Sequence, residues 1–218
     1  MEFSRASYKL VRMKPIIYVA RHGSTLLNDS GKFRGWTNIP LDKKGVDQAK
    51  EVKTDLEDID LAHAYSSDMR RAKETMDIIL EGHDIVGKEL RDMRPWDVGK
   101  FTGQPKNEEN KKELQDYADT TNKVIPGGES LNQFRERYLK AFSTIVDEAQ
   151  ASVFNGGGPS LMAQHASNCH EIGNIIYGDI DTLDVDPGGI IVVSMQGNNL
   201  SASIFKGAAT GDKPEVVS

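Results

Sequence analysis

Short apolar runs recur along the chain and are separated by longer amphipathic segments. The run Ile16–Ala20 is β-branched and aromatic and carries no charge, which predicts a buried strand. Leu61–Tyr65 and Ser160–Gln164 predict two further strands. Ile190–Met195 and Leu200–Phe205 flank a Gln-Gly-Asn-Asn turn and predict a hairpin.

Between these runs, apolar residues recur at spacings of three or four, the period of an amphipathic helix. The predicted helices cover residues 41–56, 69–80, 130–150 and 168–177. Ser67 or Asp68 is expected to cap the second helix and Ser130 the third. Strands that alternate with helices predict an α/β fold, a three-layer sandwich in which helices flank a mostly parallel central sheet. Ligands bind such sheets at the carboxyl ends of the strands.

The length of 218 residues fits one sizeable domain. We expect a single catalytic domain over residues 15–206, preceded by a flexible leader (1–14) and followed by a loose tail (207–218). The polar stretch 91–128 predicts a small, partly helical cap inserted over the site. An exposed edge strand near 190–205 could pair across a two-fold axis, so a homodimer is possible.

Composition narrows the possible functions. With 38% hydrophobic and 28% charged residues, the chain has the composition of an ordinary globular protein. The formal charge of -6 argues against a general nucleic-acid-binding role, because such domains usually carry a basic surface. A locally positive cleft on this acidic body would attract a small anionic substrate.

Cysteine content and hydropathy bear on the compartment. Cys169 is the single cysteine, which excludes an intramolecular disulfide and indicates a reducing compartment. The longest apolar runs are about five residues, far below the ~20 needed to span a bilayer. We therefore expect a cytoplasmic protein without membrane association.

Candidate catalytic residues follow several of the predicted strands. Arg21-His22-Gly23 comes directly after the first strand, where the imidazole can act as nucleophile and the guanidinium can hold phosphate oxygens. Arg71 lies just after the second strand, and His165 ends a later one. These two histidines and two arginines are expected to converge on one cleft. Such a group is unlike a structural core, because each unmatched buried charge costs several kcal/mol, and it therefore indicates a functional site.

Five segments with this chemistry resemble, in order, the motifs of the histidine phosphatase superfamily, the phosphoglycerate mutase-like proteins. The segments are RHGSTLLN (21–28), FRGWTNIPLDKKG (33–45), SSDMRRAKET (66–75), PGGES (126–130) and MAQHASN (162–168). Five ordered matches are far more specific than the short Arg-His-Gly string alone.

The resemblance implies a role for each matching residue. It implies that His22 becomes phosphorylated and that His165 lies beside it in the catalytic site. Arg21 and Arg71 would bind the phosphate with His165, and Asn28 and Arg34 would contribute at the rim. It implies no cofactor and no metal, because guanidinium groups would do the electrostatic work of a magnesium ion.

The expected proton donor departs from the family pattern. That pattern places a glutamate four residues before the first of two glycines that are themselves four residues apart. Gly99 and Gly103 keep the glycine spacing, but Pro95 stands at the glutamate position. The nearest carboxylates are Asp97, which we take as the candidate acid, and Asp92 as the alternative.

Three functions remain open from the sequence. The leading hypothesis is a metal-independent phosphomonoester hydrolase that binds a small phosphorylated substrate or inorganic phosphate. A phosphoglycerate mutase-type phosphotransferase is the runner-up. A phospholigand-binding pseudoenzyme that kept the arginines and lost its acid is the third.

Other apparent motifs fail on spacing. Cys169 lacks the arginine six residues on that a cysteine phosphatase needs, since Ile175 stands there. His170-Glu171 begins like a zinc-protease motif, but Asn174 occupies the position of the second histidine. The run 156–158 of three glycines lacks the Lys-Ser/Thr of a phosphate-binding loop.

Overall fold

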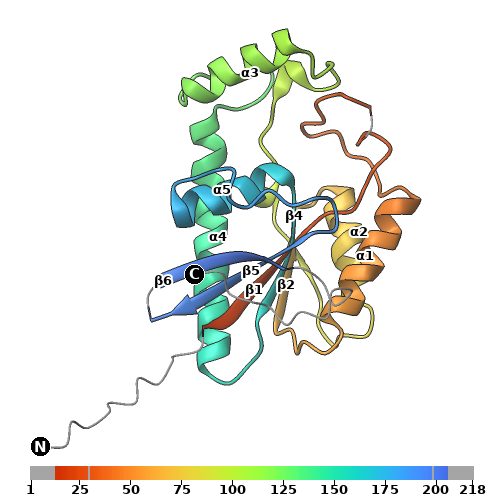
Figure 1. Ribbon diagram of the computed structural model, residues 1–218, viewed down its shortest axis with the longest axis vertical. Helices are drawn as coiled ribbons and strands as arrows, with labels where there is room; N and C mark the ends of the chain where they lie inside the picture. The colour runs from red at the N-terminus through yellow and green to blue at the C-terminus, as the bar shows by residue number, and fades with distance from the viewer. Residues whose placement is uncertain (1–12, 29, 198, 206–218) are drawn as a thin grey trace, which may run out of the picture.

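The computed structural model describes residues 13–28, 30–197 and 199–205 and contains one six-stranded sheet (Figure 1). The strands are β1 (Lys14–Arg21), β2 (His63–Ser66), β3 (Lys88–Glu89), β4 (Ser160–Gln164), β5 (Ile190–Gln196) and β6 (Asn199–Phe205). Their order is β3-β2-β4-β1-β5-β6. The first four strands in this order pair in parallel, β5 pairs antiparallel with β1, and β6 pairs antiparallel with β5. The mostly parallel sheet and the terminal hairpin predicted from the sequence are thus confirmed.

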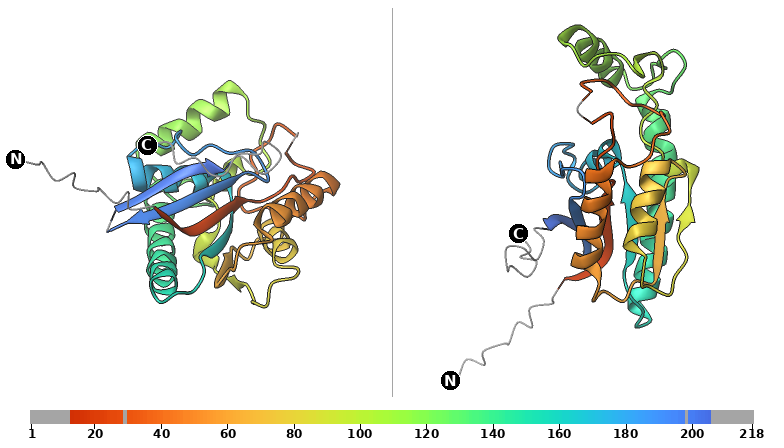
Figure 2. Two further views of the ribbon diagram at one scale, coloured as in Figure 1. Left: turned by 60° about the horizontal axis from the view of Figure 1, so that its bottom comes forward. Right: turned by 90° about the vertical axis from the view of Figure 1, so that its right-hand side faces the viewer.

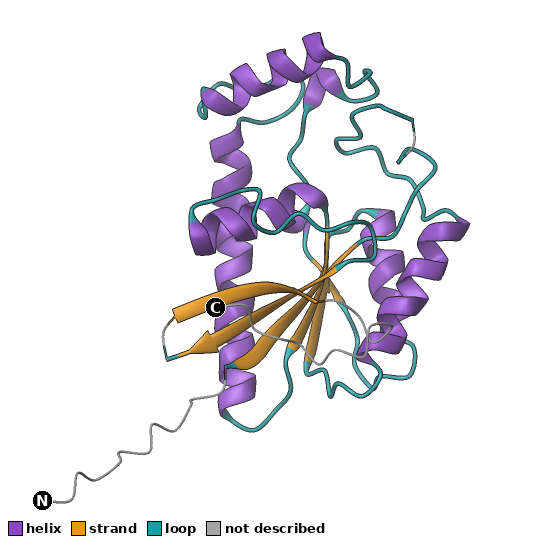
Figure 3. Cartoon of the chain, in the orientation of Figure 1, coloured by secondary structure: helices purple, strands orange, loops and turns teal. Residues whose placement is uncertain are grey.

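Helices cover both faces of this sheet, which confirms the three-layer sandwich (Figure 3). The helices are α1 (Lys43–Leu56), α2 (Arg70–Ile79), α3 (Glu108–Asp119), α4 (Leu131–Phe154) and α5 (Ala166–Tyr177), with short 3-10 turns η1 (Arg91–Met93) and η2 (Gly99–Phe101). α1 and α2 lie on one side of the strands and α4 on the other (Figure 1). α3 lies beyond the end of the sheet, above the other elements (Figure 2).

Alternation along β1 explains how the two cores form. Ile17 and Val19 pack into the cluster that α4 and α5 cover, whereas Tyr18 and Ala20 pack into the cluster under α1 and α2. Successive side chains of a strand point to opposite faces, so an uninterrupted apolar run is buried on both sides. The strand therefore runs through the centre of the domain, and its carboxyl end is held rigidly.

The helix starts follow the predicted capping residues with one exception. Ser130 forms a capping box with Gln133 at the start of α4, as expected. The expectation that Ser67 or Asp68 caps α2 is wrong, because Met69 occupies the N-cap position without a side-chain hydrogen bond. The Ser67 hydroxyl instead lies 2.7 Å from Nε2 of His165 and accepts a hydrogen bond from the Met69 backbone.

The stretch 91–128 holds η1, η2 and α3 and has a small apolar cluster of its own, separate from the two sheet cores. The buried members of this cap cluster are Val98, Phe101, Tyr117 and Ile125. Of the predicted leader, Lys14 belongs to β1, and residues 1–12 lie outside the described part of the chain, as does the predicted tail. Among the helices that the structure describes, none has the length and apolar character to cross a membrane.

Candidate active site

His22 follows the last residue of β1 at the carboxyl end of the sheet. Its backbone N–H donates to the Gln164 carbonyl (2.8 Å), which fixes it beside the end of β4. The Nδ1 atom lies 2.7 Å from the Gly23 carbonyl, an acceptor only, so Nδ1 carries the ring proton. Nε2 therefore keeps its lone pair and accepts a hydrogen bond from Arg71 Nε at 3.2 Å. The imidazole presents an unprotonated nitrogen to the site.

The glycine after His22 is required by close backbone packing. A Cβ on Gly23 would lie 2.3 Å from the carbonyl oxygen of Gly45, at the start of α1. A side chain here would push the first turn of α1 away from the strand end. The Arg-His-Gly string thus combines a functional histidine with a steric requirement for glycine at the next position.

Arg71 in the first turn of α2 is 2% exposed, and its guanidinium is spread over several partners. Besides His22 Nε2, it donates to the backbone carbonyls of Thr37 (2.8 Å) and Gly35 (3.4 Å). No carboxylate within the described ranges forms an ion pair with it. Burial and the neighbouring Arg34 lower its pKa to about 9, so the group stays cationic at neutral pH. A buried cation without a counter-ion is costly, and a bound anion would relieve that cost.

His165 follows the last residue of β4 and serves as the N-cap residue of α5. Its ring lies 5.2 Å from the His22 ring, centroid to centroid, at an interplanar angle of 64°. Burial, followed by the charges of Arg71 and Arg34, lowers the pKa of both histidines well below the usual value of a histidine. Both imidazoles are therefore neutral at physiological pH. The expected approach of the two histidines and Arg71 is observed.

Arg34 and Asn28 lie together in the loop between β1 and α1. Nη1 of Arg34 donates to Oδ1 of Asn28 at 2.7 Å, and the same oxygen accepts from the Thr25 backbone and hydroxyl. Asn28 therefore orients Arg34, which lines the pocket in front of His22. Arg34 thus lines the candidate site, whereas Asn28 is connected to the site through its hydrogen bond with Arg34.

Arg21 is directed toward another part of the chain. Its Nη1 hydrogen-bonds to the Val185 carbonyl and lies 3.7 Å from Oδ1 of Asp184. It is close enough to contribute to the lowered pKa of His22, but it is absent from the lining of the His22 pocket. The Nη1 group of Arg21 is thus engaged with these partners, and the phosphate contact of Arg21 stays a prediction.

The pocket in front of the two histidines has a volume of about 160 Å³, well below the ~300–1,000 Å³ of pockets that hold drug-sized ligands. Its lining includes His22, Arg34, Arg71, Lys106 and His165. No carboxylate of the described residues takes part in that lining. A small cavity with three cations suits a compact anionic group such as phosphate. Nowhere in the described ranges do three His, Cys, Asp or Glu side chains gather in a way that could hold a metal ion.

The two candidate acids are outside this pocket. The Asp97 carboxylate accepts from the Gly99 backbone (3.1 Å), and its neighbours Trp96 and Val98 line the pocket while it does not. Burial raises the pKa of Asp97, which favours its acid form, but the group is not brought to His22. Pro95, at the position of the expected glutamate, does line the pocket.

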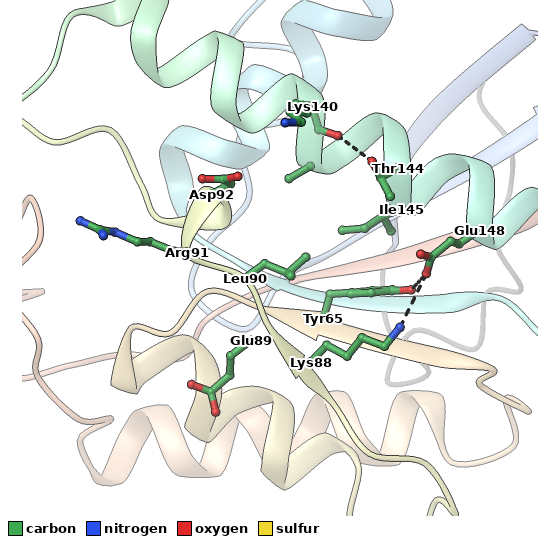
Figure 4. A pocket seen from close by; sticks show the side chains of 11 residues that line it. Tyr65, Lys88, Glu89, Leu90, Arg91, Asp92, Lys140, Thr144, Ile145 and Glu148 are labelled. Carbon is green, nitrogen blue, oxygen red and sulfur yellow. Dashed lines mark hydrogen bonds and ion pairs between the residues drawn. The ribbon is translucent and has the colours of Figure 1, made fainter.

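A larger pocket of about 390 Å³ lies between β3, η1 and α4 (Figure 4). Asp92 is part of its lining, and the Tyr65 hydroxyl is hydrogen-bonded to Glu148 there. Its charged residues balance, with three cations (Lys88, Arg91, Lys140) and three anions (Glu89, Asp92, Glu148). This balance gives no preference for a charged ligand, and the nucleophilic histidine is elsewhere, so the smaller pocket is the candidate active site.

Sequence reasoning missed two residues of the pocket. Lys106 follows the Gly103 turn and contributes a cation, and Ser167 in the first turn of α5 contributes a hydroxyl to the lining. Ser167 Oγ also accepts from the Trp96 backbone at 3.3 Å. The sequence signal for Lys106 was its position three residues after Gly103. A search limited to acids and to phosphate-binding arginines does not consider a lysine there.

Comparison with known proteins agrees with this geometry. The sequence profile of the histidine phosphatase superfamily (branch 1) matches residues 17–198. A protein named "Probable phosphoglycerate mutase GpmB" from Shigella dysenteriae is 30% identical over 140 residues, which is 62% of this chain and 65% of that protein. The Escherichia coli K12 protein of the same name is 31% identical over 140 residues with the same coverage. The chain thus spans about 65% of the length of these curated relatives.

Solved structures share the fold over most of the chain. A phosphoglycerate mutase from Bacillus anthracis superposes with a TM-score of 0.69 at 22% identity, over 88% of this chain and 93% of that one. The alpha-ribazole phosphatase from Shigella flexneri gives a TM-score of 0.70 at 19% identity, over 86% and 94%. At identities this low, the TM-scores establish a common fold and nothing more. The two similar structures are named as a mutase and a phosphatase.

Proposed function

The chain belongs to the histidine phosphatase superfamily, and from this premise we propose that it is a metal-independent phosphomonoester hydrolase. It would act on a small phosphorylated metabolite through a phosphohistidine intermediate at His22. The observation that carries the proposal is the state of His22, whose Nδ1 is held by the Gly23 carbonyl while Nε2 accepts from Arg71. That arrangement presents a neutral nucleophile beside a buried cation that forms no ion pair with any described carboxylate.

In the proposed first step, Nε2 of His22 attacks the phosphorus atom in line with the leaving oxygen. Arg71 and Arg34 neutralise charge on the equatorial oxygens, and His165 lies close enough to donate from its ring. Arg21 adds positive potential from behind the strand end. Water then cleaves the phosphohistidine and releases inorganic phosphate.

A mutase is the second candidate, favoured by the names of the curated relatives. A mutase must hold a diphosphorylated intermediate and exclude water from the phosphoenzyme. The pocket here is small, and Pro95 replaces the acid segment expected in its wall. The hydrolase therefore remains the preferred function. Phosphate release without transfer to added glycerate distinguishes the two.

The direct test is turnover of p-nitrophenyl phosphate in the presence of a metal chelator. The wild type should release phosphate, and His22→Ala should lose the activity by at least about 10⁴-fold, as expected when a catalytic nucleophile is removed. His83→Ala, in the turn after α2, is the matched control and should keep full activity. Binding of phosphate or vanadate without any turnover would instead identify a pseudoenzyme, and activity that survives in His22→Ala would refute the proposal.

A further inference from the structure

This inference rests on the proposed hydrolase and concerns the source of the proton that the leaving group needs. An alkoxide is a poor leaving group, so a positioned acid must protonate it as the bond to phosphorus breaks. Pro95 stands in the pocket wall where the family pattern places a glutamate, and it has no proton to give. A different group must supply that proton.

The carboxylates on the polypeptide near Pro95 are engaged elsewhere. Asp97 accepts from the Gly99 backbone at 3.1 Å, and Asp92 lies in the larger pocket beside α4. Glu129 receives the Arg137 guanidinium at Oε2 (2.9 Å) and the Asp97 backbone N–H at Oε1 (2.9 Å). Asp97 and Glu129 each have a structural partner, and none of the three acids lines the His22 pocket.

Lys106 does line that pocket, and the backbone fixes the segment that carries it. Its N–H donates to the Gly31 carbonyl at 2.6 Å, and its neighbour Pro105 forms a bridge with Lys32. Phe33 exchanges backbone hydrogen bonds with Gln104 (3.0 Å) and with the N–H of residue 103 (2.8 Å). The two loops are thus joined, and they hold Lys106 in the lining of the pocket that also contains the two histidines.

The surroundings of Lys106 favour proton release. Its Nζ lies 5.8 Å from the centroid of the Phe33 ring, and no carboxylate in the described ranges pairs with it. Partial desolvation, followed by the charges of Arg34, Arg21 and Lys111, lowers the pKa of Lys106. An ammonium group destabilised in this way is a stronger acid than a solvated lysine.

We propose that the ammonium group of Lys106 is the general acid and base of this active site. As the bond from His22 Nε2 to phosphorus forms and the ester P–O bond breaks, the leaving oxygen takes a proton from Nζ. The neutral amine then accepts a proton from water while the water oxygen bonds to phosphorus and the His22–phosphorus bond breaks. The products are an alcohol and inorganic phosphate, and Nζ is again an ammonium group.

The test compares two substrates whose leaving groups differ in their need for a proton, p-nitrophenyl phosphate and glycerol 2-phosphate. In Lys106→Gln, kcat/KM for glycerol 2-phosphate should fall by about 10²–10⁴, the range for loss of a general acid. For p-nitrophenyl phosphate, kcat/KM should stay within about 10-fold, because nitrophenolate leaves without a proton. Lys112→Gln, an exposed lysine on α3, is the control and should leave both values unchanged.

Lys106→Arg separates proton transfer from charge. Arginine keeps the positive charge but does not release its proton, so this variant should lose glycerol 2-phosphate turnover as Lys106→Gln does. Retained turnover in Lys106→Arg, or an equal loss on both substrates in Lys106→Gln, would overturn the inference alone. A wild type inactive on both substrates, or activity independent of His22, would overturn the proposed hydrolase and the inference with it.

Discussion

The two walls of the active-site pocket are built in different ways. His22, Arg71 and His165 stand at strand ends or a helix start, and each is at most 2% exposed. Arg34 and Lys106, on the facing wall, lie in loops, where Arg34 is half-buried and Lys106 is exposed. In the proposed mechanism, the strand ends and the helix start thus fix the nucleophile, the second histidine and one arginine, whereas the loops carry the second arginine and the proposed acid. Loops positioned by a rigid scaffold commonly carry binding and catalytic residues.

The largest expected effect is a difference in stability between the sheet core behind the rigid wall and the cap cluster behind the loop wall. Phe142 of α4 belongs to the sheet core and Phe101 of η2 to the small cap cluster. Phe142→Ala should lower the free energy of unfolding by about 3–5 kcal/mol, the usual cost of emptying a well-packed core site. Phe101→Ala should cost less, because the cap cluster to which it belongs is smaller than the sheet core, and it should raise KM by loosening the loop before Lys106. Urea denaturation with steady-state kinetics measures both effects.

Equal losses of unfolding free energy in these two variants would show that the cap and the sheet form one cooperative core. An unchanged KM in Phe101→Ala would show that the cap cluster does not hold the loop wall in place.

The next effect concerns Arg71, the arginine of the rigid wall to which the proposal assigns phosphate binding. Arg71→Gln should lower kcat/KM by about 10²–10³, or roughly 2.7–4 kcal/mol, by analogy with loss of a transition-state hydrogen-bond donor. Arg70→Gln is the matched control, since the side chain of Arg70 is 60% exposed and forms an ion pair with Glu74 on its own helix. Similar losses in both variants would mean that general positive charge, rather than the buried guanidinium group of Arg71, stabilises the transition state.

The smallest effect is the pH dependence of stability. His22 and His165 are neutral when folded, with pKa values well below the usual range, so the unfolded chain binds more protons below pH ~6.5. Stability should therefore fall as the pH is lowered from 7 to 5.5, with a slope of up to about 1.4 kcal/mol per pH unit for each histidine. In His22→Gln, the pH dependence of the free energy of unfolding, measured by thermal unfolding, should lose the contribution of His22 and keep that of His165. An unchanged slope would show that the His22 pKa is not depressed.

The sequence was most informative where local pattern and fold coincide. Ser160–Gln164 forms β4 with the predicted bounds, because its apolar run is buried in the middle of a parallel sheet. The approach of His22 to His165 was predictable, since residues that follow neighbouring parallel strands meet at one edge. The family resemblance added Arg71, which pattern alone does not distinguish from Arg70.

Features set by distant contacts were beyond the sequence pattern. Strand β3 is only two residues long and exists through pairing with β2. The partner of the Asp97 carboxylate, the Gly99 backbone, depends on the path of the loop rather than on residue type. Lys106 reaches the pocket because backbone bonds join two loops about 70 residues apart in sequence. Such loop contacts carry no periodic signal.

The most direct test of the central claim is to trap the covalent intermediate. Wild-type protein mixed with an excess of p-nitrophenyl phosphate, quenched within milliseconds in base, should carry one acid-labile phosphoryl group. Mass spectrometry of the peptides should locate that group on His22, and His22→Ala should carry none. A phosphoryl group on any other residue, or turnover in the wild type with no phosphoenzyme in the quenched samples, would contradict the account.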